Sequence, residues 1–287
     1  MASPAPPRRI ALISPGAMGS AFGARLVSAG HDVLTSLTGR SIASQSRAKE
    51  AGMQDATDAE LARCDILLSI VPPAEAEGLA ERFMPLLRAR DEKPLFVDAN
   101  ALNPDSKKAL AARLAEAGVD MVDGGIIGPP PTGGNRVTTT FLSGARAGEA
   151  AAILGVPGCA ATVLEGDVGA ASALKMCYGG INKGVVGLAS ALLLAAHRHG
   201  AADALRAEMQ RSMPDLFARF GRQIPDMVPK AYRWVAEMEE IAAFLEEHDA
   251  SGALLFEGMA GTFAQVAADR SAGGHDIAIL ERAIAPD

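Results

Sequence analysis

The stretch Arg9-Ile-Ala-Leu-Ile-Ser-Pro-Gly-Ala-Met-Gly-Ser-Ala-Phe-Gly23 decides the fold of this chain. It begins as a short apolar strand, passes through small residues and continues as a helix that begins near Ala17. Such a tight turn leaves unpaired backbone N–H groups and the positive end of a helix dipole directed at one point, which suits a pyrophosphate. Gly16 and Gly19 occupy the second and third glycine positions of a dinucleotide fingerprint. The first glycine position holds Ser14, and a plain strand–turn–helix is the alternative interpretation.

The size and charge of the chain limit its class. With 287 residues and a net charge of −7, it is long enough for two domains that each bury a core, and its acidity argues against nucleic acid as a partner. We expect no membrane span, because no apolar run approaches the ~20 residues that a membrane helix needs. Residues 1–8 are rich in proline and predict a disordered tail. Because Cys64, Cys159 and Cys177 have no metal-binding spacing, we expect reduced thiols, no metal site and a cytoplasmic protein.

The first half of the chain alternates strand and helix patterns, which predicts a parallel sheet with crossover helices. The predicted strands are 10–13, 33–37, 65–71, 95–97, 119–122, 137–143 and 161–164, and the predicted helices are 17–29, 43–51, 75–89, 104–117 and 146–154. After residue 166 the pattern changes to Ala, Leu, Met and Glu at helical spacing, with helices predicted over 170–199 and 231–247. The sequence therefore predicts an α/β domain over 9–166 and an all-helical domain over 167–287.

The helical half carries two further indications. Pro214, Pro225 and Pro229 are expected to divide its middle into short segments. A helical domain of this composition does not easily bury all its apolar faces alone, so we expect a homodimer. A monomer mass that stays independent of concentration would contradict that expectation.

Four motifs carry a resemblance to a known family. Ser14-Pro-Gly-Ala-Met-Gly19 stands for Gly-x-Gly-x-Met-Gly, and Asp98-Ala-Asn-Ala-Leu-Asn-Pro104 stands for Asp-x-Ser-Thr-x-x-Pro. Asp123-Gly-Gly-Ile-Ile-Gly-Pro129 stands for Asp-Ala-Pro-Val-Ser-Gly-Gly, and Gly169-Ala-Ala-Ser-Ala-Leu-Lys175 matches Gly-x-x-x-x-x-Lys. The departures, beside the serine at the first glycine, are Asn100 and Ala101 for Ser-Thr, Ile127 for the anion-binding serine, Pro129 for a glycine and Gly179 for an asparagine.

On these motifs the chain resembles the β-hydroxyacid dehydrogenase family, which includes 3-hydroxyisobutyrate and 6-phosphogluconate dehydrogenases and has the imine reductases as relatives. The resemblance implies a Rossmann domain, a long interdomain helix, an all-α C-terminal domain and an active site in the cleft, and dimers are common in the family. The segment 233–241 is similar to a poorly characterised phosphogluconate-dehydrogenase-like subgroup.

Lys175 is the predicted acid/base residue. It stands between Leu174 and Met176 in an apolar helix, where an unpaired charge is costly. A buried lysine can exchange a proton with an alcohol near neutral pH, because burial disfavours its charged form. The alternative is a lysine that extends to solvent or binds a carboxylate. Agreement with the family motif favours catalysis, and Lys183 ranks below Lys175 as a candidate.

Five other residues are candidates on the substrate side. Asn100 follows a strand end, where its amide is predicted to contact cofactor and substrate, or else to cap the helix after it. Tyr178 shares the helix face of Lys175 and is predicted to orient substrate or donate a proton, or else to lie in the core. By the resemblance, Arg233 aligns with a family lysine and pairs with a substrate carboxylate. Ile127-Gly128 is predicted to line the substrate and indicates a less polar ligand.

The cofactor is predicted to be NADP(H), with NAD(H) less favoured. The segment after the second predicted strand, Thr38-Gly39-Arg40-Ser41, offers hydroxyls and a guanidinium where a carboxylate would select a ribose hydroxyl. The alternative is Ser41 as a helix N-cap with Arg40 solvated. The predicted cofactor contacts are Ser14, Gly16, Ala17, Met18, Gly19, Thr38, Arg40, Ser41, Val71, Pro72 and Asn100.

These features predict an NADP-dependent dehydrogenase or reductase that acts on a small hydroxy or keto compound. One alternative is an imine or enamine reductase, in which protonation of nitrogen matters more than a base. Lys175 argues against this alternative, while Tyr178 favours it. Another is a non-catalytic NADP-binding protein, which the departures from the family motifs would fit.

Overall fold

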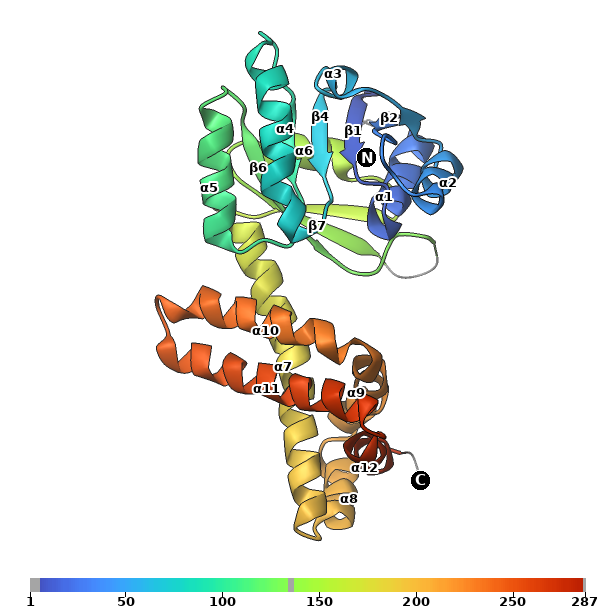
Figure 1. Ribbon diagram of the computed structural model, residues 1–287, viewed down its shortest axis with the longest axis vertical. Coiled ribbons are helices and arrows are strands. Elements are labelled where there is room, and N and C mark those ends of the chain that lie inside the picture. Colours follow the sequence, from blue (N-terminus) through green and yellow to red (C-terminus); the bar gives the residue numbers. More distant parts are fainter. Residues whose placement is uncertain (1–5, 134–136, 286–287) are drawn as a thin grey trace. The chain divides into compact units, whose positions relative to one another are not determined.

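The computed structural model describes residues 6–133 and 137–285 and divides into an N-terminal unit, Met1–Lys175, and a C-terminal unit, Met176–Asp287. In the described residues the N-terminal unit holds an eight-stranded sheet in the order β3-β2-β1-β4-β5-β6-β7-β8 (Figure 1). Strands β1 to β6 are parallel, β7 is antiparallel to β6, and β8 is parallel to β7. The strands are β1 Arg9–Ile13, β2 Asp32–Thr35, β3 Gln54–Asp55, β4 Ile66–Ser69, β5 Leu95–Asp98, β6 Met121–Ile127, β7 Thr138–Ser143 and β8 Cys159–Val163. The predicted Rossmann-type architecture is confirmed.

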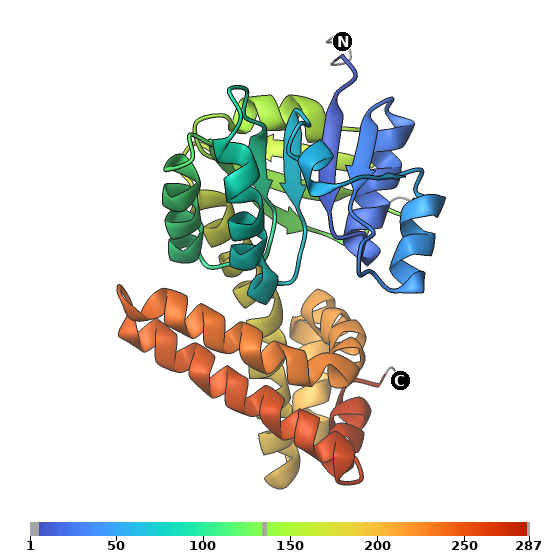
Figure 2. The same ribbon diagram turned by 45° about the horizontal axis from the view of Figure 1, so that its top comes forward.

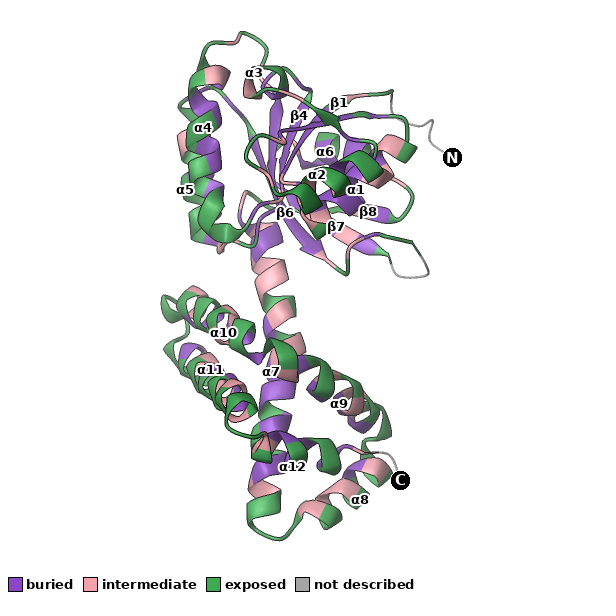
Figure 3. Cartoon of the chain, turned by 45° about the vertical axis from the view of Figure 1, so that its right-hand side comes forward, coloured by how far each residue is buried: buried purple, intermediate pink, exposed green. Residues whose placement is uncertain are grey.

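Helices cover both faces of this sheet. They are α1 Ala17–Ser28, α2 Ile42–Glu50, α3 Asp58–Leu61, η1 Pro73–Glu75, α4 Ala76–Arg88, α5 Pro104–Ala115 and α6 Ala147–Leu154. Figure 3 shows the central strands buried, and the outer faces of α4 and α5 exposed. Both faces of a parallel sheet must therefore be apolar.

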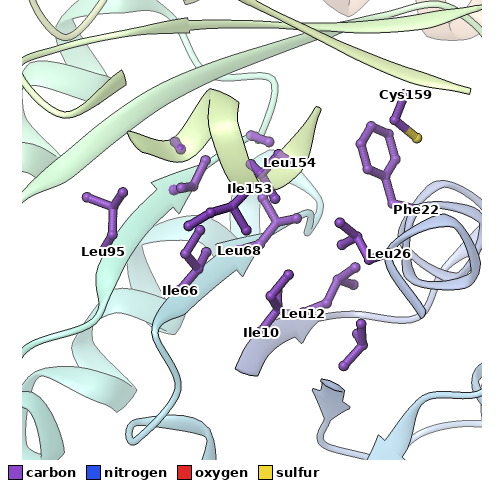
Figure 4. Close-up of a cluster of buried hydrophobic side chains, with 14 of the residues drawn as sticks. Ile10, Leu12, Phe22, Leu26, Ile66, Leu68, Leu95, Ile153, Leu154 and Cys159 are labelled. Atoms are coloured by element: carbon purple, nitrogen blue, oxygen red, sulfur yellow. The ribbon is translucent and has the colours of Figure 1, made fainter. Parts of the chain in front are cut away.

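Strand β1 shows how a continuous apolar run serves two cores. Successive side chains of a strand point to opposite faces. Ile10 and Leu12 belong to the core that includes Phe22 of α1 (Figure 4), whereas Ala11 and Ile13 belong to the core that includes helices α3, α4 and α5. Because both faces of β1 are buried, the fingerprint loop that follows β1 is held in place at the end of this strand.

Strand β6 differs from the sequence prediction. The sequence predicts a strand over 119–122, but β6 runs Met121–Ile127 and pairs with β7 up to Ile127–Thr139. Glycines occupy two positions of this strand because the neighbouring residues leave no room for a side chain. A Cβ at Gly124 would lie 3.2 Å from the Cβ of Ala99, and one at Gly125 would lie 2.6 Å from the Ala171 oxygen. The glycines therefore allow close packing and do not mark a turn.

The C-terminal unit is helical, as predicted. Its helices after α7 are α8 Ala202–Ser212, α9 Pro214–Met227, η2 Val228–Lys230, α10 Ala231–Glu246, α11 Ala250–Ser271 and α12 His275–Ala283. Helices α10 and α11 lie side by side (Figure 2). Trp234 and Phe263 meet edge to face in the core, with ring centroids 5.1 Å apart. Pro214 begins α9 as predicted, but Pro225 does not divide the chain and lies inside α9, near its end.

Helix α7, Ala170–Arg198, contains the division between the units. In the described ranges it is the one helix long and apolar enough to cross a membrane by length and composition, so the expectation that no run reaches that length is wrong. A buried core helix meets the same criterion. Gly180, Gly184 and Gly187 of α7 pack against side chains of α11, which fits a core position.

The domain boundary and the N-terminal tail also differ from the prediction. The division falls after Lys175, later than residue 166, because the first turn of α7 is bonded to the sheet. The predicted tail lies partly outside the described residues, but Arg8 is tied down: its N–H donates to His31 and its guanidinium pairs with Asp65. Cys64 and Cys159 are buried, and burial raises the pKa of each thiol to about 11, whereas Cys177 is exposed. High thiol pKa values make the two buried cysteines unreactive.

Candidate active site

The fingerprint loop connects β1 to α1. Ser14 has a φ of +75°, and among the described residues it is the one non-glycine with a left-handed φ. The family pattern has glycine at this position, and the backbone keeps the conformation that a glycine would adopt freely. A Cβ at Gly19 would overlap the Ser14 carbonyl oxygen, so only glycine permits this approach of helix to loop. The loop therefore keeps a left-handed residue at the first glycine position and a close helix approach at Gly19, although Ser14 replaces the first glycine.

The beginning of α1 fits the pyrophosphate of a nicotinamide cofactor. Gly16 is the N-cap, no side chain caps the helix among the described residues, and the first turn holds no acidic residue. A Cβ at Gly16 would meet nothing within 4 Å, so there is open space beside the backbone. The first N–H groups of a helix lack partners within it, and here those of Ala17, Met18 and Gly19 are the ones a phosphate would accept.

Replacing Ser14 by glycine is expected to stabilise the protein by about 0.5–1 kcal/mol, because relief of the left-handed conformation exceeds the added freedom of the unfolded chain. Urea unfolding measures the change in the free energy of unfolding. Ser46→Gly is the control, since Ser46 lies in α2 and is exposed, and there glycine should destabilise. A loss of stability in Ser14→Gly would contradict the backbone argument.

The segment between β2 and α2 places the predicted phosphate-binding residues together. Thr38 and Arg40 lie in the turn, and the Arg40 guanidinium has no partner within the part of the chain that the structure describes. Ser41 is the N-cap of α2 and accepts from the Ser44 N–H at 3.3 Å, as the alternative interpretation expected. A ligand role for Ser41 remains a prediction.

Two residues near this segment were not predicted from the sequence. Arg47 donates to the Pro15 oxygen at 3.3 Å and to the Ser44 Oγ at 2.9 Å, so its guanidinium links the fingerprint to α2. Asp55 of β3 accepts the N–H of Leu37 at 2.9 Å, which brings a carboxylate to the end of β2 that the order of residues did not suggest. Of these contacts, only the one between Arg47 and Ser44 could have been indicated by the sequence, because the two residues lie one helix turn apart.

Asn100 lies at the carboxyl edge of the sheet but is buried. Its Oδ1 accepts the Val71 N–H at 2.6 Å, and its Nδ2 donates to the Ser69 Oγ at 2.8 Å and to the Asp98 carboxylate at 2.6 Å. The suggestion that it caps the next helix is wrong, because Asn103 is the N-cap of α5. The structure gives Asn100 a supporting place, in which it holds Val71 beside the end of β5. Its contacts with cofactor and substrate remain predictions, as do those of Val71 and of the exposed Pro72.

A buried charge cluster lies next to Asn100, and the sequence motifs showed only half of it. Lys107 of α5 is fully buried with Asp98 and Asp123. Its Nζ donates to the Asp98 oxygen at 2.6 Å, pairs with the Asp98 carboxylate and lies 3.1 Å from Asp123 Oδ1. A lysine four residues into an ordinary helix carries no local sign of burial, so this contact could not be inferred from the sequence.

The first turn of α7 is bonded to the same cluster. Asp123 Oδ2 accepts the N–H groups of Gly169 at 3.0 Å and Ser172 at 2.9 Å. The Ser172 Oγ donates to Asp123 Oδ1 at 2.7 Å, and the Ala171 N–H donates to the Ser143 Oγ at 3.0 Å. Asp123 and Ser143 are directly paired across β6 and β7. A cross-strand pair therefore caps the helix that carries Lys175.

Lys175 follows one turn after these capped residues and is half-buried. A Cβ at Gly125 would lie 3.3 Å from the Lys175 Cβ, so this glycine lets α7 pack closely on β6. Ile127 ends the same strand, and Gly128 follows it with a φ of +126°. The N-terminal unit thus places Asn100 after β5 and Ile127-Gly128 at the end of β6, while Lys175 lies on α7, which packs on β6.

The remaining candidates belong to the C-terminal unit. Tyr178 is exposed by 53%, so its alternative as a core tyrosine is wrong, and Arg233 is exposed in the first turn of α10. Lys183 pairs with Glu237 and lies 5.7 Å from the centre of the Trp234 ring. Lys183 is therefore engaged within its own unit, which supports its lower rank.

Family models match both units. A model described as the NAD binding domain of 6-phosphogluconate dehydrogenase matches residues 9–164. A second model, described as a domain of unknown function, DUF1932, matches residues 196–266. Comparison with curated proteins gave no match.

Solved structures of similar fold cover nearly the whole chain. The conserved protein MTH1747 of unknown function, reported as structurally similar to 3-hydroxyacid dehydrogenases, is 25% identical with a TM-score of 0.74 over 92% of this chain and 98% of its own. The Mycobacterium tuberculosis 3-hydroxyisobutyrate dehydrogenase, with L-serine, is 19% identical with a TM-score of 0.72 over 96% and 99%. A Myxococcus stipitatus imine reductase in complex with NADP+ is 19% identical with a TM-score of 0.54 over 97% and 100%. The last two show the shared fold.

Proposed function

Because the chain belongs to the β-hydroxyacid dehydrogenase family, we propose that it is an NADP-dependent oxidoreductase acting on a small hydroxy or keto substrate, with Lys175 as the acid/base. The family places it among oxidoreductases with a nicotinamide-binding domain. The observation that carries the finer proposal is the capped first turn of α7, which ties the lysine-bearing helix to the sheet of the cofactor-binding unit. A reacting lysine needs such a fixed position.

In this proposal each group has a defined task. The backbone N–H groups at the start of α1 hold the pyrophosphate, with Gly19 allowing the close approach. The nicotinamide, when bound, supplies or accepts the hydride. Lys175 Nζ takes the hydroxyl proton during oxidation and returns it to the carbonyl oxygen during reduction. Asn100 supports Val71 and offers its amide to the cofactor and the substrate oxygen.

The substrate side of the proposal comes from four residues. Ile127-Gly128 at the end of β6 lines the substrate, and isoleucine in place of an anion-binding serine favours a less polar ligand. Tyr178 orients the substrate, and Arg233 pairs with a carboxylate if the substrate has one. A panel of hydroxy acids and matching apolar alcohols, assayed with NADP+, tests this preference.

Arg40→Ala is expected to weaken NADPH binding by about 10- to 100-fold while leaving NADH nearly unaffected, because only the 2′-phosphate offers the guanidinium a charge-assisted bond. Fluorescence titration of both nucleotides into wild type and variant measures the two Kd values. Lys49→Ala is the control, since it removes an exposed cation from α2, the helix that follows Arg40. Equal loss of NADPH and NADH affinity, or tighter NADH binding by the wild type, would contradict NADP selectivity and would favour recognition of the ribose by Asp55.

An imine reductase is the second candidate, favoured by Ile127 in place of the anion-binding serine and by the exposed Tyr178 hydroxyl as a proton donor. The two candidates differ in the atom that is protonated. Cyclic imines and keto acids, each assayed with NADPH, separate them. Turnover of imines that persists in Lys175→Ala but is lost in Tyr178→Phe would favour the imine reductase.

The proposal includes a homodimer in the cytoplasm. Ile181, Leu188 and Leu192 of α7 and Leu254 and Leu255 of α11 are exposed in the C-terminal unit. So many large apolar side chains exposed on two helices suit association with a second copy. Light scattering should give a mass near twice the 29.5 kDa of the chain.

A further inference from the structure

The buried cluster of Lys107, Asp98 and Asp123 holds two carboxylates and one ammonium, all with no exposed surface. Buried charges are tolerated only with well-placed partners. Asp98 is balanced by Lys107 and by the Asn100 amide. Asp123 is balanced by Lys107 and by two N–H groups at the start of α7, where the helix dipole favours a negative charge. Lys107 is therefore the one cation shared by both carboxylates among the described residues.

One side of the cluster reaches the cofactor edge. Asp98 ends β5, and its carboxylate accepts from Asn100, whose oxygen in turn accepts the Val71 N–H. These bonds join the ends of β4 and β5 at the edge where open α/β sheets bind ligands. If Lys107 lost its charge, Asp98 would keep only the amide and backbone bonds, and the Asn100 side chain would be drawn away from Val71.

The other side of the cluster reaches α7. Asp123 accepts hydrogen bonds from the Gly169 N–H and from the N–H and hydroxyl of Ser172, which fixes the axis and rotation of the first turn of α7. Lys175 is three residues after Ser172, so a change in the first turn moves the direction in which its side chain leaves the helix. Gly125 leaves no free space to absorb that movement on the β6 side.

We propose that Lys107 is a positioning residue that couples the cofactor-binding edge of the sheet to the reacting lysine, Lys175. The coupling rests on the proposed function of Lys175. Lys107 touches neither cofactor nor substrate; it holds Asp98, which supports Asn100 and Val71, and Asp123, which caps α7. Loss of Lys107 should therefore change both the affinity for the cofactor and the position of the Lys175 amine, which no other residue of the cluster controls together.

The test uses two readouts on the full chain. One is the Kd for NADPH from fluorescence titration, and the other is the rate at which Lys175 is acetylated by acetic anhydride, measured by mass spectrometry against the exposed Lys108 of the same molecule across pH. The second readout requires no substrate. It reports the position and protonation of the Lys175 amine, which a general loss of stability would not move while the protein stays folded.

Each variant has its own expected pattern. Ser172→Ala should change the acetylation rate of Lys175 by about fivefold or more and leave the NADPH Kd unchanged, because it removes a bond on the α7 side only. Asn100→Ala should weaken NADPH by about fivefold or more and leave acetylation unchanged. Lys107→Met should change both. Unpaired buried carboxylates can prevent folding. The double variant Lys107→Met/Asp98→Asn removes one charge of each sign, and the same two readouts are measured on it if Lys107→Met does not fold.

Asp249→Asn is the matched control. Asp249 caps α11 in the C-terminal unit through the Gly252 N–H, so the variant should lower the Tm and change neither readout. Folded Lys107 variants with unchanged NADPH Kd and unchanged Lys175 acetylation would overturn the proposal, as would a pattern in which only one readout moves. Failure of the wild type to bind NADPH would contradict the proposed function separately, and the acetylation readout would still decide whether Lys107 positions Lys175.

Discussion

Lys175→Met is expected to lower kcat by about 10²- to 10⁴-fold, because proton transfer by a positioned side chain contributes a factor of that size. Methionine keeps most of the length of the lysine and removes only the amine. The Kd for NADPH should stay within about twofold, since the amine acts on the reacting oxygen and not on the nucleotide. Initial rates with the substrate found in the NADPH-linked panel, together with fluorescence titration, measure both quantities.

Lys183→Met is the matched control for this prediction. Lys183 lies on the same helix, but its ammonium is engaged by Glu237 and lies over the Trp234 ring. Its replacement should lower the Tm and change kcat by no more than about threefold. If Lys175→Met turned over every reacting substrate at the wild-type rate while still binding NADPH, the catalytic role would be refuted. The interpretation as a non-catalytic NADP-binding protein would then be favoured.

Gly19→Ala is expected to remove measurable NADPH binding and to lower the free energy of unfolding by about 1–3 kcal/mol. The new Cβ would overlap the backbone oxygen of Ser14 and lie 3.1 Å from Leu12 Cδ2. A backbone atom in a tight turn directly after a strand cannot move aside as a side chain does, so the helix and the fingerprint loop must separate. Titration with NADPH and urea unfolding of the same preparation measure the two losses.

Gly23→Ala provides the control for Gly19→Ala. Gly23 is one turn further along α1, where a Cβ would lie 2.6 Å from the Met53 Sδ. Methionine is flexible and can move away, and alanine favours the helix by about 1 kcal/mol over glycine. Gly23→Ala should therefore keep NADPH affinity. Retained NADPH affinity in Gly19→Ala would show that the cofactor does not use this turn.

Much of the architecture could be predicted from the sequence. The alternation of apolar strands and amphipathic helices, and the change to helical spacing after residue 166, are local patterns that need no knowledge of distant contacts. The strand predicted over 119–122 ends too early, because Gly124-Gly125 continues β6. Glycine marks both a turn and a site of close packing, and only the neighbours Ala99 and Ala171 distinguish the two.

The candidate site was predictable only in part. Ser14, Gly16 and Gly19 were candidates because a fingerprint is a contiguous motif, and Lys175 was a candidate because a lysine between apolar residues matches the family motif Gly-x-x-x-x-x-Lys. Asn100 was found by position, but its contacts with Ser69 and Val71 come from another strand. Arg47 and Asp55 were missed, since their contacts with Pro15 and Leu37 depend on how helix and strand are placed in space.

The sequence by itself determined a nucleotide-binding α/β unit followed by a helical unit, because strand and helix periods and the small residues of the first turn are properties of short segments. Only the tertiary structure decided that Asp98, Lys107 and Asp123 form one buried cluster and that Asp123 caps α7. The physical reason is that a charged side chain in a helix is favourable in solvent by default. Its burial depends on the partners that three separate elements bring to it.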